Sequence, residues 1–112
     1  SQTASLGPAV RGVADVVDTG TLEIRGRPIR LLGVEGEGRR FARELARFLR
    51  NREVVCEPVR GEAHRCRVDG EDLSALILAA GGGRAAADAP PELLAAEDQA
   101  RASRAGLWRR AR

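Results

Sequence analysis

Three short strand patterns, joined by tight turns, fill the beginning of the chain. Val10–Val17 is largely apolar, Thr21–Arg25 alternates polar and apolar residues, and Ile29–Val34 is again mostly apolar. The turn residues Asp18-Thr19-Gly20 and Gly26-Arg27-Pro28 separate these segments. Short β-type runs bounded by Gly, Pro and Asp are typical of neighbouring strands, so the pattern predicts a meander of three strands.

The remainder of the chain carries helical and strand patterns. Phe41 and Phe48 belong to one helical apolar stripe, and with Trp108 they are expected in the core. The elements predicted after the meander are, in chain order, a helix over Arg39–Asn51, strands over Glu53–Val59 and Arg65–Val68, and helices over Glu71–Ala80 and Pro91–Ala105. Five short strands with a helix between the third and the fourth is the order of an OB-fold barrel. We therefore expect an α+β, mainly β fold, a five-stranded OB-fold barrel with about three helices.

The length of 112 residues suits one domain, which we place at residues 9–112. Ser1–Pro8 (SQTASLGP) has the small, polar composition of a flexible linker. This segment either followed a signal or membrane anchor that has been removed, or it begins at an arbitrary boundary. No apolar run approaches the roughly 18 residues of a membrane span.

The charge pattern allows several partners. All 19 basic residues are arginine, and with 16 acidic residues the net charge is +3. A basic balance is compatible with nucleic acid, anionic lipid or an acidic polymer, whereas the interleaved acids favour a mixed, solvated surface. One face of the first helix is a candidate contact for an acidic partner, or else a plain solvated face. Its arginines are Arg39, Arg43, Arg47 and Arg50, and Glu44 is spaced to pair with Arg40 or Arg47.

Cys56 and Cys66 are the only cysteines, and His64 is the only histidine. This set does not fit a zinc site, which needs four ligands. Two interpretations remain, a disulfide across a hairpin in an oxidising compartment or two buried thiols, and the short, turn-like connection favours the disulfide. No Asp or Ser partner lies near His64 in sequence, so we expect an exposed turn histidine rather than a base.

Four stretches carry a resemblance to a known family. They are VVDTGTL (Val16–Leu22), IRLLGVEGEG (Ile29–Gly38), VDGEDLSALILAAGGGRA (Val68–Ala85) and AEDQARASRAGLW (Ala96–Trp108). The last is the most specific, because it joins a helical stripe to a Gly-Leu-Trp stop. In this order they resemble the staphylococcal-nuclease, or thermonuclease-like, domain family, and the resemblance implies the same OB-fold barrel.

Active members of that family hydrolyse phosphodiester bonds with a calcium ion, which prefers carboxylate and carbonyl oxygens. The first aspartate of the family's Asp-Gly-Asp-Thr motif is retained as Asp18, but the second, a metal ligand, corresponds to Gly20. Glu35 stands where the family has its next metal-binding aspartate, with a stem longer by about one methylene. The resemblance thus leaves Asp18 and Glu35 as weak residual metal positions.

The resemblance also implies changes at the catalytic positions. Arg30 matches the first phosphate-binding arginine, with a surface pairing to Glu23 or Glu35 as the alternative. The glutamate that acts as general base corresponds to Gly38, and Glu37 lies one residue short of it. General-base catalysis is typically worth about 10²–10⁴-fold in rate, so its loss is a severe handicap for a hydrolase.

The second phosphate-binding arginine has two alignments. Arg65 is a candidate for this position. The competing alignment shortens the hairpin between the fourth and fifth strands and deletes the arginine. It places Cys66 across from Cys56, as paired cysteines lie in some exported relatives, and we favour it.

These losses imply a non-catalytic module that binds or scaffolds a protein or envelope partner, with no cofactor. One alternative is a calcium-dependent phosphodiesterase with a rearranged site using Asp18, Glu35, Glu37, Arg30 and Arg65. Another is a weak binder of single-stranded nucleic acid. The expected disulfide would place the protein outside the cytoplasm, in the periplasm or anchored to a membrane.

Overall fold

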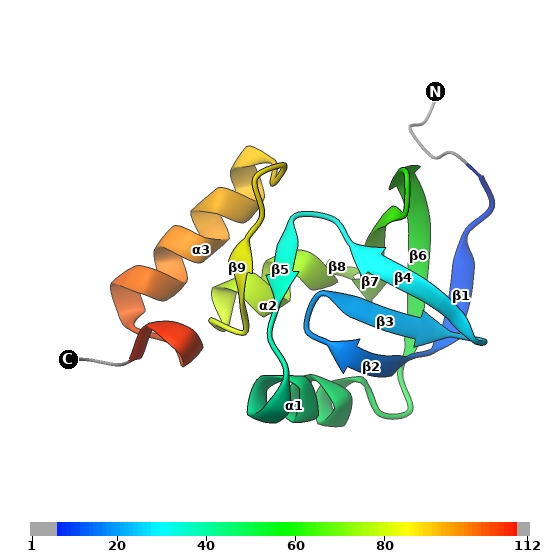
Figure 1. The fold of residues 1–112 in the computed structure, drawn as a ribbon, viewed down its shortest axis with the longest axis horizontal. Helices are drawn as coiled ribbons and strands as arrows, with labels where there is room; N and C mark the ends of the chain where they lie inside the picture. Colours follow the sequence, from blue (N-terminus) through cyan, green and yellow to red (C-terminus); the bar gives the residue numbers. More distant parts are fainter. Residues whose placement is uncertain (1–6, 110–112) are drawn as a thin grey trace.

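Strands dominate the computed structural model, which describes residues 7–109 (Figure 1). The elements are β1 (Val10–Val13), β2 (Asp15–Asp18), β3 (Thr21–Ile24), β4 (Arg27–Leu31), β5 (Val34–Gly36), α1 (Arg39–Leu49), β6 (Glu53–Arg60), β7 (Ala63–Val68), β8 (Glu71–Asp72), α2 (Leu73–Ala79), β9 (Gly83–Ala85), α3 (Pro91–Ser103) and the 3-10 helix η1 (Gly106–Arg109). This confirms an α+β, mainly β fold with three α-helices in the described part of the chain. The expected linker over residues 1–8 lies largely outside the described residues.

The first predicted strand is two strands. β1 pairs antiparallel with β6, whereas β2 pairs antiparallel with β3, and buried Ala14 separates them. The main sheet has the order β1-β6-β7-β4-β3-β2, with β8 added to β7. β4 and β7 are parallel, with Arg30 opposite Ala63 and Leu31 opposite His64. The two halves of the predicted strand therefore serve opposite edges of one sheet.

A small second sheet was not predicted. β5 pairs antiparallel with β9, and Glu35 lies opposite Arg84. The sequence around β9 is rich in glycine and alanine, which indicated a connection rather than a strand. β9 exists because its backbone finds a partner in β5, a contact that local composition does not encode.

The core lies between the sheet and the helices. Leu22 and Ile24 of β3 and Ile29 and Leu31 of β4 alternate with exposed residues, and all four are fully buried. Burying such side chains stabilises the fold by about 1.5–3 kcal/mol each. α1 packs against β2, while α2 lies between β7 and α3 (Figure 1). None of the helices within residues 7–109 is both long and apolar enough to cross a bilayer.

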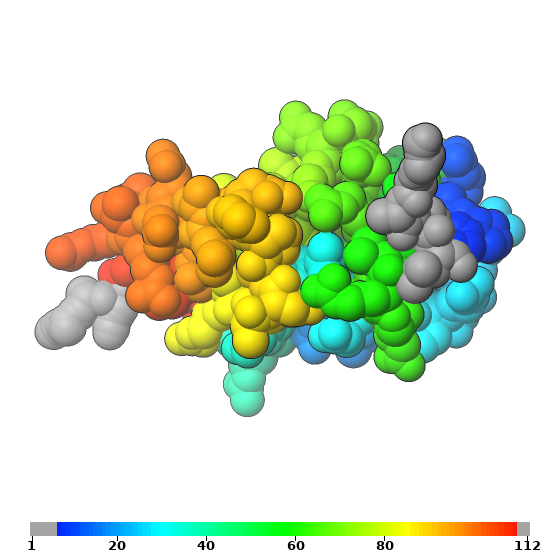
Figure 2. Space-filling view, turned by 90° about the horizontal axis from the view of Figure 1, so that it is seen from above, coloured from blue at the N-terminus to red at the C-terminus, as the bar shows by residue number. Residues whose placement is uncertain are grey.

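The molecule is elongated, with extents of 45 × 29 × 22 Å. α3 lies at one end and β1 at the other (Figure 2). Hydrogen bonds connect the end of β4 to α2 and the end of α2 to η1. Ser74 Oγ of α2 donates to the Leu32 carbonyl at 2.9 Å, and the Leu107 amide donates to the Gly81 carbonyl at 2.8 Å.

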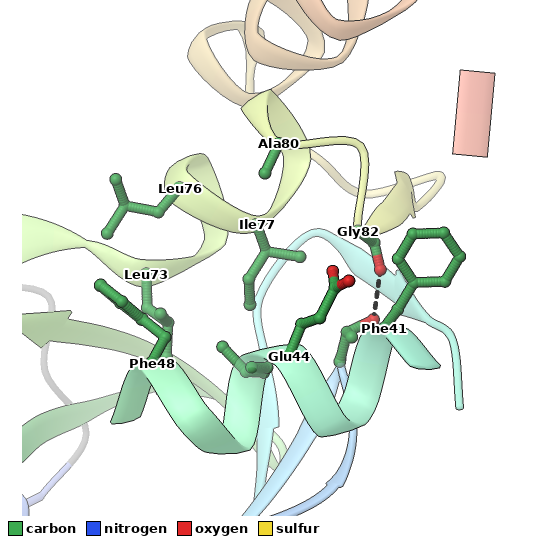
Figure 3. Close-up of a pocket in the computed structure, with 10 residues that line it drawn as sticks. Phe41, Glu44, Phe48, Leu73, Leu76, Ile77, Ala80 and Gly82 are labelled. Carbon is green, nitrogen blue, oxygen red and sulfur yellow. Dashed lines mark hydrogen bonds between the residues drawn. The ribbon is translucent and has the colours of Figure 1, made fainter. Parts of the chain in front are cut away.

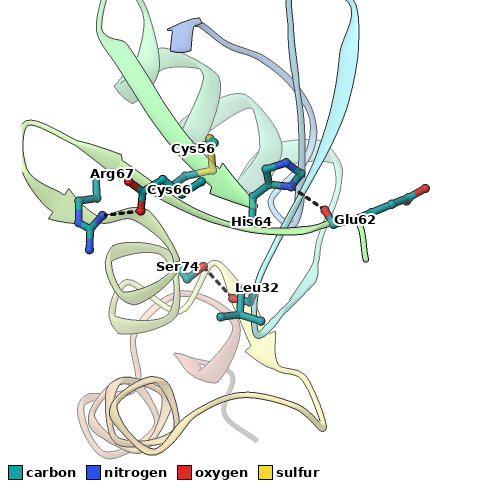
Figure 4. The surroundings of a disulfide bond; sticks show 8 residues. Leu32, Cys56, Glu62, His64, Cys66, Arg67 and Ser74 are labelled. Carbon is teal, nitrogen blue, oxygen red and sulfur yellow. Dashed lines mark hydrogen bonds and ion pairs between the residues drawn. A yellow bond between two sulfur atoms is a disulfide. The ribbon is translucent and has the colours of Figure 1, made fainter. Parts of the chain in front are cut away.

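The predicted disulfide is present. Cys56 of β6 and Cys66 of β7 face each other in the antiparallel register and are bonded, with both side chains fully buried (Figure 4). The separation is 10 residues, for which loop-closure entropy predicts a stabilisation of roughly 2–3 kcal/mol. Disulfides persist in oxidising compartments, so this bond indicates an oxidising, extracytoplasmic environment.

Candidate functional site

Thr19, in the turn between β2 and β3, ties three segments together. Its side chain is 1% exposed. Thr19 Oγ1 donates to the Gly82 carbonyl at 2.7 Å and accepts from the Glu37 amide at 2.7 Å. The Thr19 amide in turn donates to the Glu37 carbonyl at 2.9 Å. The turn is thus fixed against both the start of α1 and the end of α2.

The turn and β5 approach each other so closely that their backbones touch. A Cβ atom added to Gly20 would lie 3.0 Å from the Gly36 nitrogen and 3.1 Å from the Val34 carbonyl oxygen. One added to Gly36 would overlap Asp18 Oδ1 and the Gly20 nitrogen. A side chain at position 20 would therefore crowd the backbone of β5, which would have to shift by a few tenths of an ångström.

The two residual metal positions are not arranged as ligands. Asp18 Oδ1 accepts a hydrogen bond of 2.7 Å from the Gly20 amide, which closes the turn. Glu35 is exposed on β5, opposite Arg84. Within residues 7–109 no group of three or more His, Cys, Asp or Glu side chains is placed to hold a metal ion.

Gly38, the position expected for the general base, differs from Gly20 because it is surrounded by open space. Gly38 is the N-cap of α1, and a Cβ atom added there would have no atom within 4 Å. Glu37, one residue earlier, contacts Arg84 through an ion pair of 3.0 Å between Oε2 and Nη1. Glu37, which precedes Gly38 in the sequence, is therefore paired with a cation.

The two arginines that are candidates for binding phosphate have different surroundings. Arg30 is exposed on β4, and no carboxylate partner exists for it among the described residues, so the surface pairing with Glu23 or Glu35 is not formed. Arg65 forms an ion pair of 3.2 Å with Asp72, and Glu92 lies 4.0 Å away. Arg65 thus connects β7 to the start of α2 and to α3.

His64 contradicts the expectation of an exposed turn residue. It lies within β7, is 5% exposed and makes a 2.7 Å hydrogen bond between Nδ1 and the Glu62 carbonyl (Figure 4). Nε2 has no partner among the described residues. The hairpin is longer than predicted, so the position that resembled a turn continues the strand, where it pairs with Leu31 and Pro58.

An apolar groove of about 280 Å³ lies between α1 and α2 (Figure 3). Apolar side chains from both helices form its walls. They are Phe41, Leu45 and Phe48 of α1, and Leu73, Leu76, Ile77 and Ala80 of α2 and its C-cap. Thr19 and Gly82 lie at one end, and Glu44 contributes the charged side chain.

The prediction that the three aromatic residues lie in the core is wrong. Phe48 is 41% exposed, and Phe41 and Trp108 are half-buried. Phe41 and Phe48 follow the helical period of the core residues Leu45 and Leu49, but they face α2 across the groove rather than the sheet. The expected pairing of Glu44 with Arg40 or Arg47 is also not formed.

Comparison with known proteins adds no assignment. A scan against models of protein families finds no match, and neither does a search of curated proteins. Function must therefore be inferred from the residues described above.

Proposed function

We propose that the chain is a non-catalytic, staphylococcal-nuclease-like OB-fold domain that acts as a binding module outside the cytoplasm. The four sequence stretches that resemble the family are spread along the chain from Val16 to Trp108. The disulfide supports an oxidising compartment, for which the periplasm or a membrane-anchored position is the proposal.

The strand order supports a barrel. β1 and β2 occupy the two edges of the main sheet, yet in the chain only Ala14 separates them. A single strand bent at Ala14 would pair with β6 along one half and with β3 along the other, and so would close the sheet on itself. The parallel pair β4–β7 and the helix between β5 and β6 accord with the same OB order.

The contact between Gly20 and Gly36 carries the proposal that hydrolysis is lost. In the family that the chain resembles, a metal-binding carboxylate takes the position of Gly20. Here even a Cβ atom at that position would lie only 3.0–3.2 Å from the backbone of β5, which would have to shift to admit it. The missing base at Gly38 and the pairing of Glu37 with Arg84 add to the loss.

A nuclease assay tests the proposal. The full chain is incubated with single-stranded DNA and RNA, with and without calcium, and both cleavage and binding are measured. We expect no calcium-dependent cleavage. Cleavage abolished by Glu35→Ala, but retained in the control Glu23→Ala, would contradict the proposal and support the rearranged nuclease.

Binding of single-stranded nucleic acid without cleavage can be recognised by its salt dependence. A single-strand binder neutralises phosphates with arginine, and its affinity falls steeply with salt. Exposed Arg30, which has no carboxylate partner in the described part of the chain, would be its first contact. If binding to the nucleic acid is salt-sensitive and is lost in Arg30→Ala, the partner is a nucleic acid and not a protein or an envelope component.

A further inference from the structure

The groove between α1 and α2 leaves apolar side chains exposed to solvent. Phe48 is 41% exposed at its lip, and half-buried Phe41 and Leu76 face the same space. The labelled side chains of both helices point toward one another across the hollow without filling it (Figure 3). Exposed apolar surface gathered in one concave place is typical of a binding site.

The outer face of α1 is strongly positive. Arg40, Arg43 and Arg47 are exposed, and no carboxylate pairs with them among residues 7–109. Elsewhere carboxylates do accompany arginines, as in the 2.7 Å pair of Arg52 with Asp69. An arginine-rich helix whose charges are not compensated within the domain is complementary to an acidic partner.

The shape of the surface favours a protein segment over a bilayer. A membrane-binding helix presents protruding apolar side chains to the lipid. Here the phenyl rings line a hollow, which instead receives side chains that protrude from a partner, as in the binding of a helix in a groove. Aromatic residues and arginine are also the types enriched at protein interfaces.

Nucleic acid fits the same surface less well. Single-strand binders stack bases on free aromatic faces. The Arg40 guanidinium lies over the Phe41 ring at 5.2 Å from its centroid, and Arg52 lies over the Phe48 ring at 5.0 Å. One face of each ring is therefore already covered by a cation.

We infer that this groove docks an acidic amphipathic segment of a partner protein. The apolar side chains of the segment fill the space between α1 and α2, and its carboxylates contact Arg40 and Arg47, which flank the groove-lining face of α1. Glu44, which has no partner in the described residues, meets a basic or hydrogen-bond-donating group at one point of the segment. This inference rests on the proposed binding function and specifies the partner's chemistry.

A displayed library of random peptides, selected on the full chain, is the probe. We expect enriched peptides with apolar residues spaced three or four apart and a net negative charge. A representative synthetic peptide is then titrated against variants. Ala80→Glu, at the groove wall, and the double variant Arg40→Glu/Arg47→Glu should each weaken binding at least tenfold.

Matched controls carry the same changes outside the groove. Ala79→Glu lies on an exposed position of α2 that does not line the groove, and Arg25→Glu/Arg27→Glu removes two exposed arginines of the β3–β4 hairpin. Both should bind the peptide within about twofold of the wild type. Unchanged circular dichroism and thermal unfolding establish that each variant is folded.

Several results would overturn the inference. They are a selection without enriched peptides, enrichment of basic peptides, or binding that ignores Ala80→Glu. If the groove binds anionic phosphatidylglycerol vesicles, its occupant is a membrane and not a protein segment. If the protein forms a dimer that Ala80→Glu abolishes, the occupant is a second copy of the chain. The proposed binding function would be contradicted by a different result, calcium-dependent cleavage in the nuclease assay. Failure of that proposal can therefore be distinguished from failure of the inference about the groove.

Discussion

Thr19 is the side chain on which the arrangement around the candidate site depends. Its hydroxyl group satisfies the Glu37 amide and the Gly82 carbonyl, which belong to segments on opposite sides of the turn. The residue is buried, so water cannot replace these bonds without rearrangement. The Thr19 hydroxyl therefore holds the turn between β2 and β3 against the segment before α1 and the segment after α2.

Replacement of Thr19 by valine should be strongly destabilising. Thr19→Val keeps the side-chain shape but leaves a buried donor and a buried acceptor unpaired, so we expect a loss of roughly 2–4 kcal/mol in the free energy of unfolding. Urea denaturation measures this loss. The control Thr21→Val, at a half-buried position of β3 whose hydroxyl makes no such bond, should stay within about 0.5 kcal/mol of the wild type. Equal effects at both positions would show that the bridging role is wrong.

Gly20 and Gly38, where the resemblance implies lost carboxylates, should respond in opposite ways to an introduced carboxylate. Gly20→Asp forces a side chain against the backbone of β5, and we expect it to cost about 1–3 kcal/mol of stability without creating calcium affinity. Gly38→Glu enters open space at the start of α1 and should be nearly neutral. Urea denaturation and calcium titration of both variants check this. A stable Gly20→Asp protein that binds calcium would contradict the packing argument.

At the scale of elements, the hairpin β6–β7 is predicted in part: the cysteine pairing is correct, but β7 begins at Ala63 and includes His64. Its cysteines were expected to face each other, and the register places Cys56 opposite Cys66. Strand patterns and helix periods are local, which is why β6, α1 and α3 lie close to their predicted bounds. The β5–β9 pair and the bond from Thr19 to Gly82, across 63 residues, depend on tertiary contacts that no local pattern encodes.

The candidate site was predicted less well than the fold, for a physical reason. The resemblance to the nuclease family implied that oxygen-bearing side chains are missing at Gly20 and Gly38. It could not reveal that position 20 is closed by β5 whereas position 38 is open. Nor could the helical stripe of Phe41 and Phe48 distinguish a core face from a groove, because both have the same period.

The disulfide should account for a measurable share of the stability of this hairpin. The double variant Cys56→Ala/Cys66→Ala removes the cross-link without leaving an unpaired thiol, and we expect a loss of about 2–3 kcal/mol. Urea denaturation with and without a reductant provides the comparison. Reductant should lower the stability of the wild type and leave that of the double variant unchanged. A wild type that is insensitive to the reductant would show that the bond does not form.

For the whole molecule, the question is whether the sheet and the helical end unfold together. The hydrogen bond from Ser74 to Leu32 and the pairing of β5 with β9 join the two parts through buried contacts. At the far end, Trp108 packs under the Arg101 guanidinium, 4.2 Å from the ring centroid. As the only tryptophan, it reports on that end of the molecule alone.

We therefore expect one cooperative transition. Tryptophan fluorescence and far-UV circular dichroism, which reports the strands and helices together, should give the same urea midpoint. Ser74→Ala leaves the buried Leu32 carbonyl without its hydroxyl donor, at a cost of about 1–3 kcal/mol, and should lower both midpoints equally. Ser103→Ala, at an exposed position of α3, should leave both unchanged. A fluorescence transition that precedes the circular dichroism transition would mean that the helical end unfolds on its own, and that the buried contacts do not couple it to the sheet.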